Sequence, residues 1–430
     1  MRVLVVGGGG REHALCWALR RDAPPPDATI FAAPGNPGTA TLGTNLQIAA
    51  TAVDDLVSAV TQYDIDLTIV GPEAPLAAGL TDRLRGDGRA VFGPSRAAAQ
   101  LESSKAYAKE VMRRAGVPTA ASAAFAELGP ALDYIRAHRE PLVVKASGLA
   151  AGKGVVVCDT RAAAEAAARA MLAGGTLGDA GREIVVEEFL EGEELSVLAL
   201  TDGERIVILP PAQDHKRLGE GDTGPNTGGM GAYCPVSLAT APLLARVRRE
   251  VLEPVLREMA AQGVPYEGVL YAGLMLARDG TPYVLEFNCR FGDPEAQVVL
   301  PGLAPGVSRH FVDIATRRWR PSSDALTPAR AAVTTVLAAR GYPDHPEKGA
   351  AIRLPGDLGD DVLVFHAGTS CGPDGVLRTA GGRVLNITGL AATVPAAARA
   401  SAAACERIEF DGKTWRRDIA WREIERAGAA

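Results

Sequence analysis

A glycine-rich segment that carries two lysines, residues 145–154, is the first candidate for chemistry in this sequence. Glycines let backbone N–H groups approach phosphate oxygens without a Cβ clash, and lysines add positive charge. The segment is not a P-loop, because Gly154 stands where that motif requires Ser or Thr after its lysine. Apolar runs flank it, so we predict a strand–loop–strand flap that binds phosphates, with a flexible hairpin as the alternative. The flap residues assigned to this binding are Lys145, Ser147, Gly148, Gly152, Lys153 and Gly154.

A Glu-x-Asn pair, Glu286 and Asn288, ends the apolar run 283–287. Side chains at i and i+2 of a strand share one face, so a carboxylate and an amide oxygen would lie side by side. Such oxygen ligands suit Mg²⁺ or Mn²⁺. Arg290 follows and could hold a carboxylate or a phosphate. A solvated strand end is the simpler explanation of an isolated Glu-x-Asn pair, so the metal assignment depends on the residues that accompany it.

Strands and helices are expected to alternate over the first hundred residues. The expected strands are 2–6, 29–33, 67–70 and 90–92, and the expected helices are 11–20, 55–62 and 81–86. This alternation predicts a parallel α/β sheet. The turn 7–10 opens a helix whose N-terminus favours an anion. It matches a dinucleotide fingerprint poorly, because Glu12 replaces the last glycine.

The pattern becomes more mixed after residue 100. We expect helices at 105–115, 161–173 and 246–262, strands at 142–145, 155–158 and 184–188, and hairpins at 195–209 and 270–287. A glycine-rich, charged loop covers 214–231, where His215 is expected to order the loop rather than act as a base. A linker is expected at 320–323, and short strands with turns follow it. The expected fold class is therefore α/β and α+β, in several domains.

Composition excludes some classes of protein. The 430 residues carry a net charge of −6, which argues against a nucleic-acid or membrane surface over the whole chain. The six cysteines are scattered without a C-x-x-C pair, so neither a zinc site nor a disulfide framework is predicted. No charged-then-apolar leader precedes the first strand. We therefore expect a cytoplasmic protein that binds neither nucleic acid nor membrane.

The order of these features resembles the ATP-grasp superfamily of enzymes. Lys105, Lys145 with its flap, an acidic strand end at 185–190, and then Glu286 and Asn288 follow one another as they do there. In that superfamily two lysines contact the phosphates, the acidic strand end contacts adenine, a later Glu contacts ribose, and the Glu/Asn pair holds magnesium. The resemblance implies ATP as a ligand, held by Lys105 and Lys145, by Glu187 and Leu190 at adenine, and by Glu194 at ribose.

Five strings narrow the resemblance to the phosphoribosylamine–glycine ligase family. They are residues 8–14, 71–76, 213–217, 224–231 and 286–297, and the similarity runs from residue 1 to about 425. Ser147 and Gly8 depart from the residues common in that family, Asp and Asn. Neither departure removes a lysine or a metal ligand, so the activity is still implied, while flap dynamics and ATP affinity stay open.

The family resemblance implies substrates and roles. Glycine would be phosphorylated by ATP, and phosphoribosylamine would attack the resulting acyl phosphate, as the second step of purine synthesis. Asp214 is assigned to the glycine ammonium, and Arg290 to the transferred phosphate or the glycine carboxylate. Lys145 is counted with these two as catalytic. The residues assigned to the two substrates are Gly9, Gly10, Arg11, Pro72, Glu73, Asp214, Lys216, Arg290 and Gly292.

The resemblance also implies the organisation of the chain. A substrate-binding α/β domain would cover 1–102, an ATP-grasp domain 103–324 with a flap subdomain at about 122–194, and a small mixed α/β domain 328–425. We expect a monomer that makes transient contact with the upstream amidotransferase.

Three alternatives remain open at this point. The chain could be another ATP-grasp carboxylate–amine ligase or carboxylase, a nucleotide-binding regulatory protein with an inactive site, or a dinucleotide oxidoreductase. Intact lysines and the Glu286/Asn288 pair disfavour the second, and the poor N-terminal fingerprint disfavours the third.

Overall fold

The computed structural model describes residues 1–23, 26–150, 154–173, 175 and 177–429. Its N-terminal part is a parallel sheet of order β3-β2-β1-β4-β5, as the alternating pattern predicted. The strands are β1 (Arg2–Gly7), β2 (Thr29–Pro34), β3 (Thr44–Asn45), β4 (Leu67–Val70) and β5 (Ala90–Phe92). The helices are α1 (Gly10–Asp22), α2 (Thr39–Leu42), α3 (Val53–Gln62), α4 (Glu73–Ala77) and α5 (Leu80–Gly86).

The carboxyl ends of β1 and β4 are neighbours in this sheet. The turn 8–10 leaves β1, and Pro72 and Glu73 follow β4, so these two segments meet at one edge. β1 lies between β2, which follows it, and β4, so the chain order changes direction there. Ligands of open α/β sheets bind at such positions.

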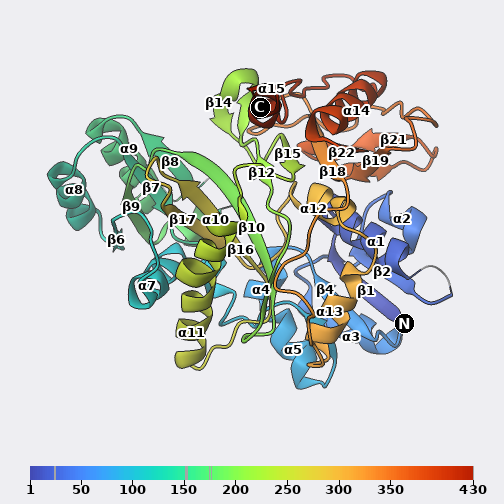
Figure 1. Cartoon of the computed structure of the whole chain (residues 1–430), viewed down its shortest axis with the longest axis horizontal. Helices are drawn as coiled ribbons and strands as arrows, with labels where there is room; N and C mark the ends of the chain where they lie inside the picture. The colour runs from blue at the N-terminus through green and yellow to red at the C-terminus, as the bar shows by residue number, and fades with distance from the viewer. Residues whose placement is uncertain (24–25, 151–153, 174, 176, 430) are drawn as a thin grey trace.

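The flap forms a separate antiparallel sheet of order β6-β9-β7-β8. It follows α6 (Gln100–Ser103) and α7 (Lys105–Ala115), and contains β6 (Ser122–Phe125), α8 (Leu128–Ala137), β7 (Leu142–Ala146), β8 (Val155–Cys158), α9 (Arg161–Leu172) and β9 (Ile184–Glu188). Small apolar residues of α8 and α9 pack with the sheet in a core of their own. In Figure 1 this lobe stands out at one side of the molecule, in teal and green.

The central sheet has the order β11-β10-β16-β17 and is antiparallel. Its strands are β10 (Glu193–Thr201), β11 (Ile206–Ile208), β16 (Gly268–Leu276) and β17 (Pro282–Asn288). The helix expected at 246–262 begins earlier: α10 (Ala241–Val247) and α11 (Glu253–Ala261) are joined by a π-helical turn, Arg248–Leu252. Thr240 caps α10 by accepting a hydrogen bond from the Leu243 N–H, a stronger start signal than the apolar spacing.

A third sheet joins segments that lie far apart in the chain, with the order β12-β15-β18-β22-β19. Its strands are β12 (Gln213–Asp214), β15 (Gly231–Cys234), β18 (Ala331–Ala338), β19 (Val362–His366) and β22 (Arg383–Ala391). The remaining elements are the hairpins β13 (Arg217–Gly219) with β14 (Thr223–Asn226) and β20 (Thr369–Cys371) with β21 (Leu377–Thr379), and the helices α12 (Ala296–Gly302), α13 (Val307–Ala315), α14 (Val394–Arg407) and α15 (Trp421–Ala429). The loop expected at 214–231 is thus largely a β-hairpin.

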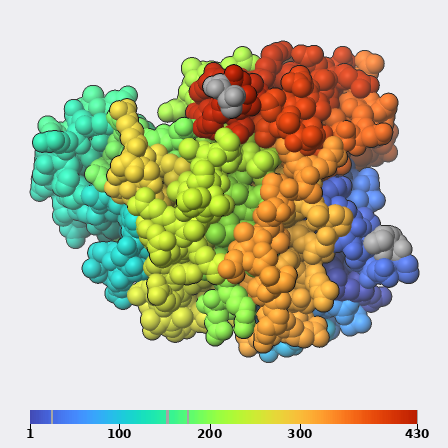
Figure 2. Space-filling view, viewed as in Figure 1, coloured from blue at the N-terminus to red at the C-terminus, as the bar shows by residue number. Residues whose placement is uncertain are grey.

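The space-filling view shows the C-terminal residues, in red, directly against lime-green residues from the middle of the chain (Figure 2). The N-terminal residues, in blue, lie on the side opposite the flap lobe (Figure 2). Among the described residues, no helix is long and apolar enough to cross a membrane.

An aromatic cluster holds α13 against the N-terminal sheet and the end of the central sheet. The Phe311 ring lies 4.7 Å from the Phe92 ring and 5.7 Å from the Phe291 ring, measured between centroids. All three side chains are buried. The cluster therefore joins β5 of the N-terminal sheet to the segment that follows Arg290.

Phe311→Ala should lower the free energy of unfolding by about 3–5 kcal/mol, because it leaves a cavity among buried rings. Chemical denaturation followed by tryptophan fluorescence measures this loss. Val376→Ala removes an exposed apolar side chain, and its free energy of unfolding should stay within about 0.5 kcal/mol of the parent. Equal losses for the two variants would contradict this role of the cluster.

Candidate active site

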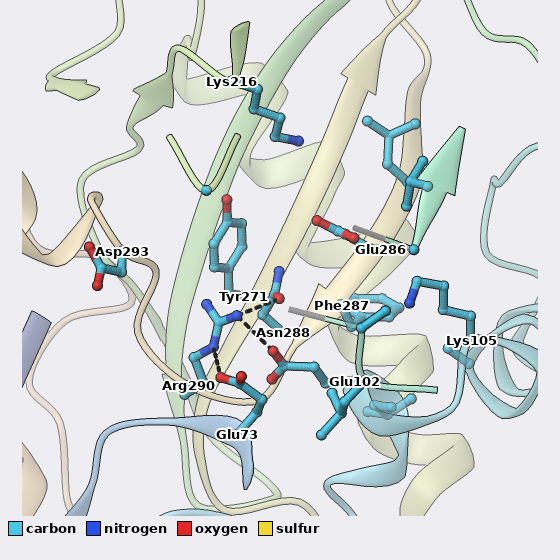
Figure 3. Close-up of a pocket in the computed structure, with 18 of the residues that line it drawn as sticks. Glu73, Glu102, Lys105, Lys216, Tyr271, Glu286, Phe287, Asn288, Arg290 and Asp293 are labelled. Carbon is cyan, nitrogen blue, oxygen red and sulfur yellow. Dashed lines mark hydrogen bonds and ion pairs between the residues drawn. The ribbon is translucent and has the colours of Figure 1, made fainter. Parts of the chain in front are cut away.

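A cavity of about 430 Å³ lies where the N-terminal sheet, the flap and the central sheet meet. Its polar lining comes from elements of every part of the chain: Arg11, Glu73, Glu102, Lys105, Lys109, Glu187, Asp214, Lys216, Glu286, Asn288, Arg290, Asp293, Glu295 and Arg383. Figure 3 shows Lys105, Lys216 and Glu286 directed towards one another across it. Ten of the residues predicted from the sequence line this cavity: Arg11, Glu73, Lys105, Gly154, Glu187, Asp214, Lys216, Glu286, Asn288 and Arg290.

A β-bulge in the central sheet places the Glu-x-Asn pair. Gly273 of β16 pairs with Glu286, whereas Leu274 pairs with Val284, so Leu285 is the extra residue. The Leu285 carbonyl accepts a hydrogen bond from Lys145 Nζ at 3.2 Å. A Cβ on Gly273 would lie 3.3 Å from Glu286 Cγ, so this glycine leaves room for the glutamate. The bulge thus fixes the position of Glu286 and also bonds Lys145 of the flap.

Glu286 and Asn288 share the face of β17 that lines the cavity. Burial alone would raise the pKa of Glu286, but Lys216, Lys145, Lys105 and Arg290 outweigh it and lower the pKa below its ordinary value. Asn288 Oδ1 accepts a hydrogen bond from Arg290 at 3.1 Å. The pair therefore offers one ionised carboxylate and one amide oxygen.

Three lysines surround the end of β9. Glu187 Oε2 lies 2.9 Å from Lys145 Nζ, and Glu187 Oε1 lies 3.2 Å from Lys109 Nζ. Lys105 Nζ donates to the Gly148 carbonyl at 3.4 Å. Burial lowers the pKa of Lys105 and of Lys109. The Glu187 carboxylate is committed to two lysines, so any contact of this residue with adenine falls to its backbone.

Arg290 joins the central sheet to the N-terminal domain. Its guanidinium lies 2.7 Å from the Glu102 carboxylate and 3.4 Å from that of Glu73 (Figure 3). The second Glu102 oxygen accepts the Cys289 N–H at 2.7 Å. Burial would raise the pKa of Glu73, but Arg290 and Arg11 lower it below its ordinary value. Arg290 is held between two carboxylates, beside the Glu-x-Asn pair.

Asp214 and Lys216 enter the cavity from the end of β12. Lys216 Nζ pairs with Glu194 at 2.5 Å, so the residue expected at ribose is joined to a residue expected at substrate. Burial, together with Glu295, Glu194 and Glu286, raises the pKa of Asp214 to about 8, against the opposing effect of Lys216. Asp214 is therefore prepared to ionise when a cation approaches it.

The N-terminal loop lies at the cavity through Arg11. The Arg11 guanidinium is 2.6 Å from Glu12 and donates to the Phe291 carbonyl at 3.2 Å. The Gly9 N–H donates to Glu12 at 2.6 Å. A Cβ on Gly10 would lie 2.2 Å from Asn386 Nδ2, so glycine is required where the loop meets β22.

The other predicted residues lie around the cavity. Ser147 caps the start of α7, where its Oγ accepts the Ala106 N–H at 3.1 Å. A Cβ on Gly292 would clash with Glu295 at 2.2 Å, and Pro72 precedes α4. Leu190 is half-buried just after β9. Gly152 and Lys153 lie outside the described residues.

Several lining residues were not expected from the sequence. Lys109 lies one helical turn after Lys105, a spacing that could have suggested a shared face. Glu295 accepts hydrogen bonds from Tyr271 at 2.5 Å and Ser196 at 3.2 Å. Glu102 and Arg383 carried no local signal, because their partners are remote in the chain. Asp293 lies within the string 286–297 but was assigned no role.

Three family models match the chain consecutively. They describe the N domain, the ATP-grasp (A) domain and the C domain of phosphoribosylglycinamide synthetase, over residues 1–102, 103–296 and 332–422. The chain belongs to the phosphoribosylglycinamide synthetase family. Curated relatives agree: the phosphoribosylamine–glycine ligase of Ralstonia nicotianae is 48% identical over 99% of this chain and 100% of its own, and that of Salmonella typhimurium is 47% identical over 99% of each.

Solved structures support the same family and its fold. The phosphoribosylamine–glycine ligase of Thermotoga maritima superposes with a TM-score of 0.87 at 37% identity, over 98% of this chain and 100% of that one. A biotin carboxylase from Campylobacter jejuni reaches a TM-score of 0.75 at 15% identity, over 96% and 92%, which shows a shared fold alone. The predicted multidomain fold and the predicted family are therefore confirmed, and ATP is the nucleotide that this family uses.

The raised pKa of Asp214 gives a pH dependence of stability in the ligand-free protein. Between about pH 4 and pH 8 the unfolded chain has released this proton while the folded chain keeps it. The folded state then binds more protons, so stability falls as pH rises through this window. Compared with Asp214→Asn, the parent should lose stability from pH 5 to pH 8, as measured by denaturant midpoints. Parallel pH profiles for the two proteins would contradict the assignment.

Proposed function

We propose that this chain ligates glycine to 5-phosphoribosylamine, with ATP converted to ADP and phosphate, to give glycinamide ribonucleotide in the second step of purine synthesis. The observation that carries the proposal is Arg290, which lies beside the Glu-x-Asn pair and reaches Glu73 at the edge of the N-terminal sheet. One cavity thereby serves a nucleotide site on the central sheet and a substrate site on the N-terminal domain. Named relatives at 47–48% identity over nearly full length support the same reaction.

The reaction requires activation, because a carboxylate resists attack by an amine. A glycine carboxylate oxygen attacks the γ-phosphorus of ATP, the bond to the bridging oxygen breaks, and ADP leaves. The amine of phosphoribosylamine then attacks the carbonyl carbon of glycyl phosphate. The C–O bond breaks, phosphate leaves, and the nitrogen loses one proton. The enzyme mainly positions the reactants and neutralises charge on the phosphoryl group.

The lysines suit the phosphates of ATP. Lys105 of α7 lines the cavity, and Lys145 of β7 contacts two lining residues, Glu187 and Leu285. Lys109 adds a third cation, held through Glu187. We assign Lys105 and Lys145 to the phosphates, Glu187 and Leu190 to adenine, and Glu194 to ribose. The flap, including Ser147, Gly148, Gly152, Lys153 and Gly154, would cover the phosphates and exclude water from the acyl phosphate.

Glu286 and Asn288 fit a divalent cation. The carboxylate is ionised and has no ion-pair partner among the described residues, and it lines the cavity. Both ligands are hard oxygens on one strand face. We propose Mg²⁺, with Mn²⁺ as a substitute. Glu286 and Asn288 would hold the ion, which would supply charge neutralisation for the phosphates of ATP.

The remaining polar residues suit the two smaller substrates. Gly9, Gly10 and Arg11 lie at the start of α1, where a phosphate of phosphoribosylamine is favoured, and Pro72 with Glu73 is adjacent. Asp214 would accept the glycine ammonium, and Lys216, Gly292 and Arg290 would border the glycine carboxylate. Asp214 and Lys216 come from the end of β12, Arg290 and Gly292 follow β17, and the others come from the turns of the N-terminal sheet.

Four further expectations accompany the reaction. We propose a monomer, transient contact with the amidotransferase that supplies phosphoribosylamine, and a cytoplasmic location, based on the scattered cysteines. We also propose domains at 1–102, 103–324 and 328–425.

The deciding assay incubates the protein with ATP, Mg²⁺, glycine and freshly generated phosphoribosylamine, and measures ADP and glycinamide ribonucleotide. Both should form in equal amounts and only with glycine present, with no dependence on bicarbonate. Formation of AMP and pyrophosphate would overturn the acyl-phosphate mechanism. Bicarbonate-dependent ATP hydrolysis would favour a carboxylase, and no ADP in a single turnover would favour an inactive regulatory protein.

Asp214→Asn should raise the KM for glycine by roughly tenfold or more, because the charged hydrogen bond to the ammonium is lost. The KM for ATP should stay within about twofold of the parent, since Asp214 is assigned no contact with the nucleotide. Initial rates at varied glycine and varied ATP give both constants. An unchanged KM for glycine would remove Asp214 from this role.

A further inference from the structure

The hairpin 214–231 carries four residues that line the cavity, Asp214, Lys216, Thr227 and Gly228, all at its base. Asp214 and Lys216 line the cavity, while the tip, Glu220–Asp222, lies beyond β13 and β14. The strands are tied at the base by Thr227, whose N–H and hydroxyl both donate to the Lys216 carbonyl, at 2.7 Å and 2.9 Å. These two bonds tie the Lys216 backbone to the opposite side of the hairpin.

Arg416 lies between α14 and α15 and contacts the hairpin near its tip. Its guanidinium donates to the Arg217 carbonyl at 3.0 Å and pairs with Asp222 at 2.9 Å. It also makes two hydrogen bonds to Asp418, at 2.8 Å and 2.7 Å. Asp418 in turn accepts the Gly221 N–H at 2.9 Å. In Figure 1 the hairpin, in lime, lies beside α15 and the C-terminus.

The same segment also holds the base of the hairpin. His215 lies between Asp214 and Lys216, and its Nε2 accepts the Ala420 N–H at 2.9 Å. This contact matches the loop-ordering role expected for His215. Ala420 has φ 70°, a left-handed conformation that costs a non-glycine residue energy. The segment 416–420 keeps this strained geometry while it contacts both ends of the hairpin.

Burial makes the Arg416 contacts strong and specific. The side chain is only 1% exposed, so its charge depends on Asp222 and Asp418 for compensation. Removing one partner of a buried pair leaves a charge without compensation. A guanidinium also bonds two carboxylates and a carbonyl in one plane, which a lysine ammonium cannot reproduce. Arg416 thus connects the hairpin and the C-terminal segment through geometry that few substitutions would preserve, alongside Arg422, which also pairs with Asp222, at 2.5 Å.

We propose that Arg416 is a positioning residue for the ligation: it locks the hairpin 214–231 to the C-terminal segment and so sets Lys216 and Asp214 in the cavity. The inference rests on the proposed function, which gives these two residues their roles. It assigns the C-terminal domain a part in catalysis although Arg416 does not line the cavity.

Two substitutions test this contact, one on the hairpin and one on the C-terminal segment. Asp222→Asn keeps the shape of the hairpin, because Asp222 has φ 55° and asparagine tolerates that conformation well. Arg416→Gln removes the cation. Each should lower kcat on the order of tenfold or more, the usual size of a small misplacement of catalytic groups. The KM for ATP should stay within about twofold, because the adenine side of the site lies on other elements.

A double-mutant cycle separates positioning from general damage. In a Lys216→Met background, Asp222→Asn should lower kcat by a smaller factor than in the parent, since one of the two groups that it positions is already gone. An equal loss of kcat in both backgrounds, or an unchanged kcat in folded Asp222→Asn, would overturn the inference. If Arg416→Gln does not fold, Asp222→Asn and Arg416→Lys decide the same question.

Ile408→Ala is the matched control, because Ile408 is buried in the core of the C-terminal domain and does not touch the hairpin. It should lower Tm while kcat stays near the parent value well below that temperature. A loss of kcat equal to that of Asp222→Asn would mean that the domain matters only for stability. Failure of the proposed function is distinguishable, because the parent itself would then form no ADP in response to glycine.

Discussion

The central constraint on this structure is the compensation of charge inside one cavity built from remote parts of the chain. Arg290 lies between Glu73 and Glu102, and Glu286 is surrounded by three lysines, so no cation or carboxylate there is stable alone. Ion pairs at this depth cost desolvation, which the surrounding packing must offset. The three sheets have to meet closely enough to place these partners within 4 Å, and the domain arrangement follows from that requirement.

The same charges set the ionisation states of two carboxyl groups in the cavity, Glu286 and Asp214. Cations are concentrated where phosphates would lie, and they keep Glu286 ionised, whereas the carboxylates near Asp214 help to raise its pKa. Neighbouring carboxylates thus have opposite pKa shifts, set by which charges lie nearest. The ionised Glu286 suits the metal proposed for it, and the protonated Asp214 suits the ammonium group proposed for it. A site that phosphorylates one substrate and holds the amine end of the same molecule needs both.

The sequence predicted elements well wherever the signal was local. The parallel sheet, the helix 105–115, the flap strands β7, β8 and β9 and the Glu-x-Asn strand were all expected, because periodicity and turn residues specify them, whereas β6 was not. α14 was not expected, since its alanines form only a weak apolar stripe. Glu102 and Arg383, which also line the cavity, were not expected for another reason. Each forms an ion pair with a residue more than eighty positions away in the chain, and no local sequence pattern encodes such a pairing. The bulge at Leu285 was missed as well, although it places Glu286.

The site residues differ in how the fold holds them in place. Glu286 and Asn288 lie on a central strand whose bulge is fixed by pairing with β16, so their spacing is rigid. Asp214 and Lys216 lie at the base of a hairpin, where the backbone bonds of His215 to Gly231 and Met230 hold only its first residues. A metal ligand pair can depend on its own sheet, but residues on a hairpin need support from outside it. The buried Arg416 network supplies that support, which explains why a polar, strained segment at the end of the chain is packed so closely against the hairpin.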